Sequence, residues 1–269
     1  MAYAPLAALT AADVADVRVV LTDIDDTLTD DGRLGPAAYA ALWRLQEAGF
    51  AVVPVTGRPA GWCDHFARMW PVAGVVGENG ALAYAYDPRA RRMSTLWATT
   101  EAERAALPAR RAAIAADVLR EVPRARVASD QPFRIHDLAI DFAEDVVPAL
   151  DESHVDHIVA IFERHGATAK VSSIHVNGWF GTYDKLSMIH TFARTHLGLD
   201  LATQPRAAIY AGDSPNDAPA FAAFPLSVGV ANVRAFAHRL ATPPRYVTPS
   251  PGGHGFAELA DALLALRGR

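Results

Sequence analysis

The sequence has very little cysteine and no long apolar run. Cys63 is its single cysteine, which excludes an intrachain disulfide framework and leaves no cysteine pair for a zinc site. We expect Cys63 to be a small buried hydrophobic residue. No apolar run in the sequence approaches the roughly 18 residues that a membrane-spanning helix needs. We therefore expect a soluble protein with no membrane partner.

The sequence also lacks an excess of positive charge and a recognisable leader. Lys and Arg number 25 against 30 Asp and Glu, a formal net charge of −5, so a generic electrostatic attraction to nucleic acid or anionic lipid is not expected. The first residues have neither a basic segment nor an unbroken apolar segment, and we expect no secretory signal. A cytoplasmic location is the prediction that follows.

Short β-branched segments predict a buried parallel sheet at both ends of the chain. Residues 17–22, 51–55 and 72–76 are apolar runs separated by helical stretches, the first of which opens at Pro36 and closes at Gly49. Such runs are typical of strands buried on both faces. Apolar runs of the same kind occur again at 207–211 and 226–230, and a last helix is predicted near 256–266. Repeated strand–helix alternation indicates an α/β fold.

The middle of the chain has a different pattern of apolar and polar residues. The segment 77–86 is predicted to form a hairpin, and a helix is predicted at about 99–121. Apolar and polar residues then alternate over 134–142, which predicts a sheet with one wet face; a helix at 151–165 and a strand at 168–176 follow. The sequence thus predicts a Rossmann-like α/β core of residues 1–86 and 180–269, interrupted by an α+β domain of residues 87–179, called the insert below.

Polar residues follow the predicted buried strands. They are Asp23-Ile24-Asp25-Asp26-Thr27, Thr56-Gly57-Arg58, Lys185, and Gly212-Asp213-Ser214-Pro215-Asn216-Asp217. Taken singly, the Asp and Thr residues are equally compatible with turns and helix caps. Lys185 is more informative because it opens a helical run, where the helix dipole disfavours a cation. An anionic neighbour or ligand would relieve that mismatch.

Taken together, these segments predict a single ligand-binding crevice at the carboxyl ends of the strands. Ligands of open α/β sheets bind at the carboxyl ends of the strands. Four carboxylates gathered there, from Asp23, Asp25, Asp213 and Asp217, would raise one another's pKa unless a cation intervenes. Hard oxygen ligands favour Mg²⁺. A hydroxyl, a lysine and free backbone N–H groups supply the donors that a phosphoryl group in transfer requires.

The four segments, in this order, resemble the four motifs of the haloacid dehalogenase (HAD) superfamily. The insert between the second and third motifs, preceded by Gly77-Glu78-Asn79-Gly80-Ala81, is similar to the large α/β cap of subclass IIB. That subclass includes Cof-type hydrolases, sucrose-phosphate and trehalose-phosphate phosphatases, and eukaryotic-type phosphomannomutases. The resemblance implies a HAD core carrying a cap that determines substrate specificity.

The resemblance also implies catalytic roles. Asp23 would be the nucleophile and Asp25 the general acid and base. Thr56 and Lys185 would hold the phosphoryl oxygens. Apart from the resemblance, we expect their neighbours Gly57 and Arg58 to bind substrate or phosphate, although Arg58 could instead cap the helix that follows Thr56. One small departure is Asp26, which stands where many members of the superfamily have Gly.

The resemblance further implies a magnesium site. Asp213 would bind Mg²⁺ together with the Asp23 carboxylate and the Asp25 main-chain carbonyl. Asp217 would be a ligand through water or a brace behind the site. Asn216 would be a partner to Asp217 or to the phosphoryl group.

Three functions are compatible with these residues. The first is a Mg²⁺-dependent phosphatase that acts on a small phosphorylated metabolite, a sugar phosphate by resemblance, through an aspartyl phosphate. The second is a phosphosugar mutase with the same nucleophile, which would need a basic cluster on the cap; Arg124 and Arg126 are candidates for a second phosphate. The third is a phospho-signalling receiver, which needs neither the insert nor the acidic segment near 213. The substrate and the oligomeric state are not predicted.

Some polar residues of the insert have two interpretations. His154 and His157 have helical spacing, but a solvated helix face accounts for them better than a metal site. His175, Asn177, Trp179 and Phe180 line either the cleft or a packing surface. Arg134, His136 and Asp137 either meet the substrate or face water.

Overall fold

The core of the protein is a six-stranded parallel sheet. We describe a computed structural model, in which residues 3–172 and 174–268 are described. The strand order is β1 (Ala4–Pro5), β15 (Tyr246–Val247), β14 (Ser227–Gly229), β13 (Ala208–Gly212), β2 (Val19–Thr22) and β5 (Ala51–Pro54). Every pairing in this sheet is parallel. The predicted α/β class is confirmed.

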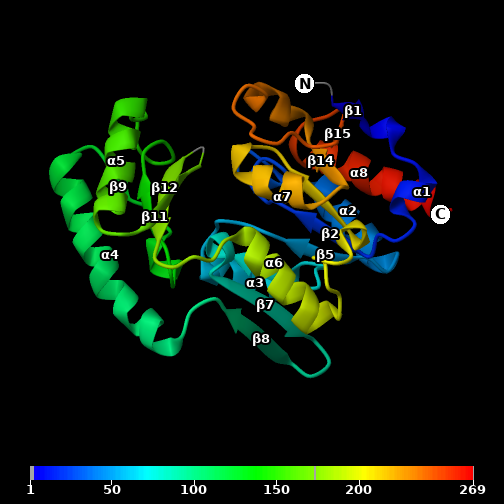
Figure 1. The fold of residues 1–269 in the computed structure, drawn as a ribbon, viewed down its shortest axis with the longest axis horizontal. Helices are drawn as coiled ribbons and strands as arrows, with labels where there is room; N and C mark the ends of the chain where they lie inside the picture. Colours follow the sequence, from blue (N-terminus) through cyan, green and yellow to red (C-terminus); the bar gives the residue numbers. More distant parts are fainter. Residues whose placement is uncertain (1–2, 173, 269) are drawn as a thin grey trace.

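Helices cover both faces of this sheet because its strands are apolar on both sides. In β2, Val20 contributes to one hydrophobic cluster and Val19 and Leu21 contribute to the other, as the two-residue period of a strand requires. The first cluster includes α2 (Pro36–Glu47), α3 (Ala60–Met69) and α8 (Gly252–Leu266), and the second includes α6 (Lys185–Phe192) and α7 (Ala218–Ala223). The short helix α1 (Ala11–Val14) lies near α8 (Figure 1).

An antiparallel extension continues the core beyond β5. A single parallel bridge joins Val55 to Val76 in β6 (Val75–Gly77), and β6 pairs with β7 (Leu82–Asp87), which pairs with β8 (Arg92–Trp97). The 3₁₀ turn η2 (Glu78–Gly80) connects β6 to β7. The predicted boundary at residue 87 therefore falls inside the β7–β8 hairpin, so the first strand of the insert as we defined it pairs with the core. The domain boundaries themselves stay a prediction.

The insert forms a second sheet with two helices on it, beside the core in Figure 1. Its strands run in the order β11 (Thr168–Val171), β12 (His175–Trp179), β10 (Leu138–Asp141) and β9 (Arg126–Val127), and its helices are α4 (Glu101–Glu121) and α5 (Glu152–Arg164). All pairings are antiparallel. The single strand predicted at 168–176 is wrong, because β11 ends at Val171 and β12, which begins at His175, pairs with it in the antiparallel direction.

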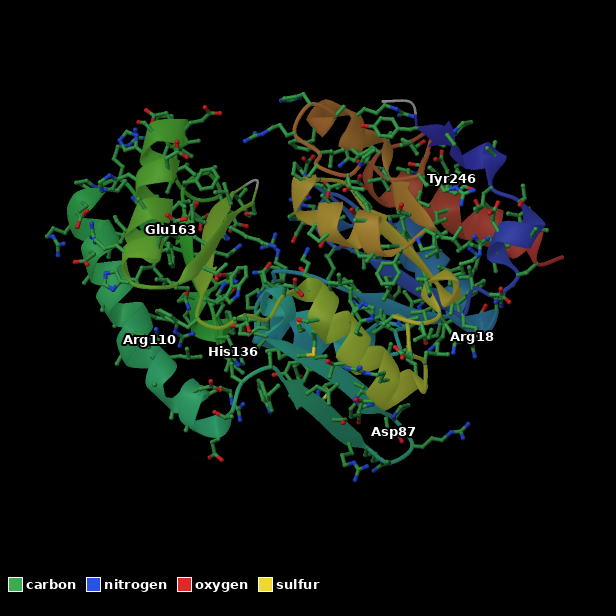
Figure 2. All side chains as sticks on the ribbon, in the orientation of Figure 1. Arg18, Asp87, Arg110, His136, Glu163 and Tyr246 are labelled. Atoms are coloured by element: carbon green, nitrogen blue, oxygen red, sulfur yellow. The ribbon has the colours of Figure 1, made fainter. Side chains whose placement is uncertain are left out.

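The predicted wet face of the segment 134–142 is also wrong. Arg134, His136, Asp137 and Asp141 are buried, with exposed fractions of 6%, 0%, 0% and 1%. The apolar residues of β10 pack under α4 and α5, as alternation requires. The segment 134–137 is covered because it lies against the core, where Figure 2 labels His136. Asp141 is covered by the loop that follows it, whose amides donate to its carboxylate. Both interpretations of Arg134, His136 and Asp137 must therefore be revised: these residues contact neighbouring protein groups.

Candidate active site

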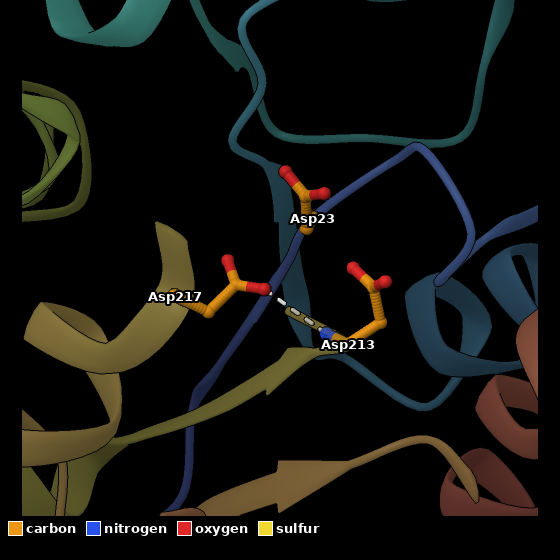
Figure 3. A group of neighbouring side chains, drawn as sticks. All are labelled: Asp23, Asp213 and Asp217. Atoms are coloured by element: carbon orange, nitrogen blue, oxygen red, sulfur yellow. Dashed lines mark hydrogen bonds between the residues drawn. The ribbon is translucent and has the colours of Figure 1, made fainter. Parts of the chain in front are cut away.

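Two adjacent strands bring Asp23 and Asp213 together. Thr22, the last residue of β2, pairs with Ala211 of β13, and the Asp23 amide donates to the Ala211 carbonyl at 2.9 Å. Both strands are parallel, so their carboxyl ends lie at one edge of the sheet. Asp23, Asp213 and Asp217 each offer a carboxylate oxygen within 4.8 Å of the others (Figure 3). The acids that are far apart in the sequence thus meet as predicted.

Asp217 is held by the protein itself. Its Oδ1 accepts from the Tyr210 hydroxyl at 2.6 Å, and its Oδ2 accepts from the amides of Asp213 and Ser214 at 3.0 and 3.2 Å. Figure 3 marks the bond to the Asp213 amide. With both oxygens engaged, Asp217 fits the role of a brace that fixes the turn after β13. Of the two roles considered for Asp217, the contacts favour this one.

The carboxylates of Asp23 and Asp213 are buried next to other carboxylates. Burial, and after it the neighbouring Asp217 and Asp23, raise the pKa of Asp213 to about 9. Burial also raises the pKa of Asp23 to about 7, against the opposing effect of Lys185. Two buried carboxylates that resist ionisation together are suited to a divalent cation, whose charge compensates both. Oxygen donors of this kind fit Mg²⁺.

Lys185 supplies the positive charge seen in the structure. It is the first residue of α6, which Asp184 caps by accepting from the Ser187 amide at 2.7 Å. The Lys185 ammonium donates to Asp23 Oδ1 at 2.8 Å and lies 4.0 Å from Asp217 Oδ1. Burial opposes its charge, but Asp23 and Asp217 raise the pKa of Lys185 above its usual value. The anionic neighbour that its place in the helix predicts is therefore Asp23.

The Thr56–Gly57–Arg58 loop follows β5 at the same edge. The Thr56 hydroxyl oxygen accepts from the Arg58 amide at 3.0 Å, which leaves the hydroxyl hydrogen free to donate. Among the described residues, no acceptor is found for the Gly57 amide. A hydroxyl and an amide without a protein acceptor are the donors that a bound phosphoryl group requires.

Arg58 binds Asp25, an arrangement that sequence reasoning missed. The guanidinium holds the Asp25 carboxylate through Nε at 3.0 Å and Nη2 at 2.8 Å. The Asp25 side chain is 36% exposed and is not part of the group formed by Asp23, Asp213 and Asp217. The two motifs are far apart in sequence, and nothing in their spacing indicates this pair.

Two asparagines complete the surroundings of the acids. Asn232 donates to the Asp26 carbonyl at 2.9 Å and to Asp213 Oδ2 at 3.3 Å. It was not predicted, although it follows β14 at the same edge of the sheet, which was the available signal. Asn216 Oδ1 is buried and has no hydrogen-bond partner among the described residues. Asp26 has φ of 56°, a conformation that explains glycine at this place in the resembled motif.

Comparisons with known proteins agree with this architecture. Residues 20–99 match the family model of haloacid dehalogenase-like hydrolases. No curated protein matches the sequence. A solved structure from Thermoplasma acidophilum aligns with a TM-score of 0.69 at 16% identity, covering 92% of this chain and 98% of its own. A HAD/Cof-like hydrolase from Plasmodium vivax, described as putative, aligns with 0.68 at 19%, covering 95% and 98%.

A third similar structure is that of an enzyme with a named activity. The sucrose-phosphatase from Synechocystis, in complex with sucrose and phosphate, aligns with a TM-score of 0.60 at 16% identity, covering 91% of this chain and 97% of its own. The fold is thus that of the HAD superfamily. The recognition of this superfamily from four motifs is confirmed, and with it the prediction of a hydrolase. No helix in the described part of the chain is long and apolar enough to cross a membrane.

Proposed function

We propose that the protein is a Mg²⁺-dependent phosphatase of the cytoplasm that hydrolyses a small phosphorylated metabolite, a sugar phosphate, through an aspartyl phosphate on Asp23. The observation that carries the proposal is the surroundings of Asp23, whose carboxylate lies beside the Lys185 ammonium at 2.8 Å and within 4.8 Å of Asp213 and Asp217. The similarity of the fold to a sucrose-phosphatase and to a trehalose-6-phosphate phosphatase related protein supports a sugar phosphate as substrate.

In the first step, an oxygen of Asp23 attacks phosphorus opposite the leaving oxygen. Lys185 and the Thr56 hydroxyl hold the phosphoryl oxygens and neutralise their charge. Asp23 and Asp213 would hold Mg²⁺, which would supply further positive charge at these oxygens. Asp25 protonates the departing alkoxide. The reaction is thereby divided into two displacements, each easier than direct hydrolysis.

In the second step, Asp25 takes a proton from water, which attacks the phosphorus and frees Asp23. Arg58 keeps the Asp25 carboxylate in one orientation through two of its nitrogens. A carboxylate that must accept and return a proton needs a fixed position relative to the reacting oxygen. The pair with Arg58 supplies that position.

The charge that the insert brings to the site favours a phosphatase over a mutase. Glu144 Oε1 lies 3.6 Å from Arg58 Nη1, and Glu144 Oε2 lies 2.9 Å from His175 Nε2. A mutase must bind a second phosphate in addition to the one on the nucleophile, and a carboxylate beside Arg58 would repel that second anion. The hydroxyl groups of a sugar, in contrast, donate hydrogen bonds to a carboxylate.

The test is the release of inorganic phosphate from a panel of phosphate monoesters in the presence of Mg²⁺. We expect release by the wild type, none by Asp23→Asn, and unchanged release by Asp31→Asn, a control in an exposed turn. Turnover by Asp23→Asn would contradict the assignment of the nucleophile. Conversion of one sugar phosphate to another, dependent on a bisphosphate and with little free phosphate, would identify the mutase instead.

A further inference from the structure

Each of the three backbone carbonyl groups of the Thr56–Gly57–Arg58 loop accepts a hydrogen bond from another segment of the protein. The Thr56 carbonyl accepts from the Asn79 amide at 3.1 Å, and the Arg58 carbonyl accepts from the Glu78 amide at 3.2 Å. Both donors belong to the core turn η2. The Gly57 carbonyl accepts from Arg134 Nη1 at 3.0 Å, so a residue of the insert completes the set.

Arg134 is suited to hold a carbonyl at a fixed place. Its side chain is 1% exposed. Nε and Nη2 donate to the two oxygens of Asp130 at 2.9 and 2.8 Å, and Nη1 donates to Asp137 Oδ1 at 3.0 Å as well as to Gly57. A planar guanidinium bound at both ends by carboxylates has little freedom to turn. The Gly57 carbonyl is therefore bound by a rigid donor.

The segment that carries Arg134 is itself bound to the core. Glu78 is fully buried, and its carboxylate accepts four amides: those of Ala60, Ile135, His136 and Asp137, at 2.9, 2.8, 2.6 and 3.1 Å. One donor is in the core and three are in the insert. The turn that holds two carbonyls of the loop thus also positions the residue that holds the third.

The consequence for the loop follows from the geometry of a peptide group, whose C=O and N–H point in opposite directions. Arg134 fixes the Gly57 carbonyl, and this orients the Arg58 amide. The Arg58 amide donates to the Thr56 hydroxyl oxygen at 3.0 Å. The orientation of the Thr56 hydroxyl therefore depends on the Arg134 guanidinium, which contacts the loop at the Gly57 carbonyl.

We infer that Arg134 is a positioning residue of the active site: from the insert, it holds the 57–58 peptide so that the Thr56 hydroxyl donates to the phosphoryl group. This inference rests on the proposed function, since it assigns that donor to a phosphate ester. It also connects the insert to the phosphate-binding loop through a contact that does not involve the substrate.

The test is a double-mutant cycle between Arg134 and Thr56, with p-nitrophenyl phosphate as substrate and inorganic phosphate as competitive inhibitor. We expect Arg134→Met to lower kcat/KM about 10-fold or more and to weaken phosphate inhibition, with Arg134→Lys restoring part of the loss. In the Thr56→Ala background, Arg134→Met should have little further effect, because both act through one hydroxyl. Equal effects of Arg134→Met in the two backgrounds would overturn the inference.

The matched control is Arg111→Met. Arg111 Nη1 donates to the carbonyls of Arg134 and Asp137 at 3.4 and 3.2 Å, so it supports the same segment without contacting the loop. We expect Arg111→Met to leave phosphate inhibition unchanged. If it weakens phosphate inhibition as much as Arg134→Met does, Arg134 is only a structural residue and the inference is wrong.

A measurement without substrate covers two further cases. If Arg134→Met does not fold, amide hydrogen exchange of the loop is compared between Arg134→Lys and the wild type. We expect faster exchange at Arg58 in Arg134→Lys and not in Arg111→Met; identical exchange in all three proteins overturns the inference. If the wild type hydrolyses no phosphate monoester, the proposed function fails, and the exchange result then reports on the peptide contact alone.

Discussion

At the scale of single residues, the role of a carboxylate here follows from the donors around it. Glu78 and Asp217 are surrounded by N–H and O–H groups of the protein and hold backbone in place. Asp23 and Asp213 are equally buried, yet they lie next to other carboxylates, and their pKa values are raised by burial first and by those neighbours second. Residue type alone therefore does not distinguish a brace from a ligand.

This distinction limits what the sequence predicts. The motifs correctly identify Asp23, Lys185 and Asp213 as neighbours. Strand order brings the backbones of Asp23 and Asp213 to one edge, and the start of α6 places the Lys185 side chain beside Asp23. The pair of Arg58 with Asp25 was not predictable, since it depends on the path of two loops. Glu78 was noted only as part of a hairpin, because no local pattern indicates that a carboxylate will accept amides from a segment more than fifty residues away.

His136 provides a prediction at the same scale. It lies between the two connections to the insert, with Nε2 at 2.9 Å from the Thr99 hydroxyl and its ring beside Trp97 and Tyr183. Burial lowers its pKa from 6.5 to about 4, although Asp137 opposes the shift. The folded protein therefore keeps His136 neutral at pH values where the unfolded chain protonates it.

The free energy of unfolding should consequently fall as the pH is lowered from 6.5 to about 4, and His136 should contribute nothing to the pH dependence above this window. His136→Gln should remove a pH-dependent loss on the order of 2 kcal/mol. The measurement is urea unfolding at several pH values, with His65→Gln at an exposed position of α3 as control. Parallel pH curves for the wild type and His136→Gln would show that the group does not titrate as described.

At the scale of elements, the turn η2 and the start of α6 depend on each other. Gly80 has φ of 98°, and a Cβ at this position would lie 2.0 Å from the Asp184 carbonyl oxygen. Only glycine allows the turn to approach the residue that caps α6. The hairpin thereby holds the helix end from which Lys185 reaches Asp23.

The alternating pattern of 134–142 shows the limit of prediction from a local sequence pattern. Alternation states which side chains share a face of the strand, and it does not state what covers that face.

Gly80→Ala should therefore destabilise the protein by more than about 3 kcal/mol, through a backbone clash added to an unfavourable φ. The control is Gly166→Ala, where φ is 71° and a Cβ would meet nothing within 4 Å; it should cost about 1 kcal/mol. Thermal and urea unfolding of both variants measure the difference. Equal losses would mean that the close approach of the turn to α6 contributes nothing.

At the scale of the whole molecule, the site is formed by two segments that are far apart in the sequence and adjacent in one sheet. Asp23 follows an early strand, and Asp213 follows a late strand that pairs with it directly. A cation bound between them is bound by the folded protein only, because the unfolded chain does not hold the two acids together. Metal binding and stability are therefore linked.

Saturation with Mg²⁺ at about 100 times its dissociation constant should stabilise the wild type by about 2.7 kcal/mol relative to protein in a chelator. Asp213→Asn should remove this increase and should also raise the stability of the metal-free protein, because one of the crowded carboxylates is gone. Asp31→Asn should respond to Mg²⁺ as the wild type does. An undiminished Mg²⁺ effect in Asp213→Asn would exclude this pair of acids as the binding site.

The pairing of β2 with β13 has a consequence for synthesis on the ribosome. Val19 and Ala208 are partners in the sheet, so the strand that precedes the proposed nucleophile is translated before β13 and stays without this neighbour until β13 has been made. A nascent chain that stops before Ala208 lacks both the missing strand and Asp213. The group formed by Asp23, Asp213 and Asp217 is therefore complete only after β13 and the turn that follows it have been translated.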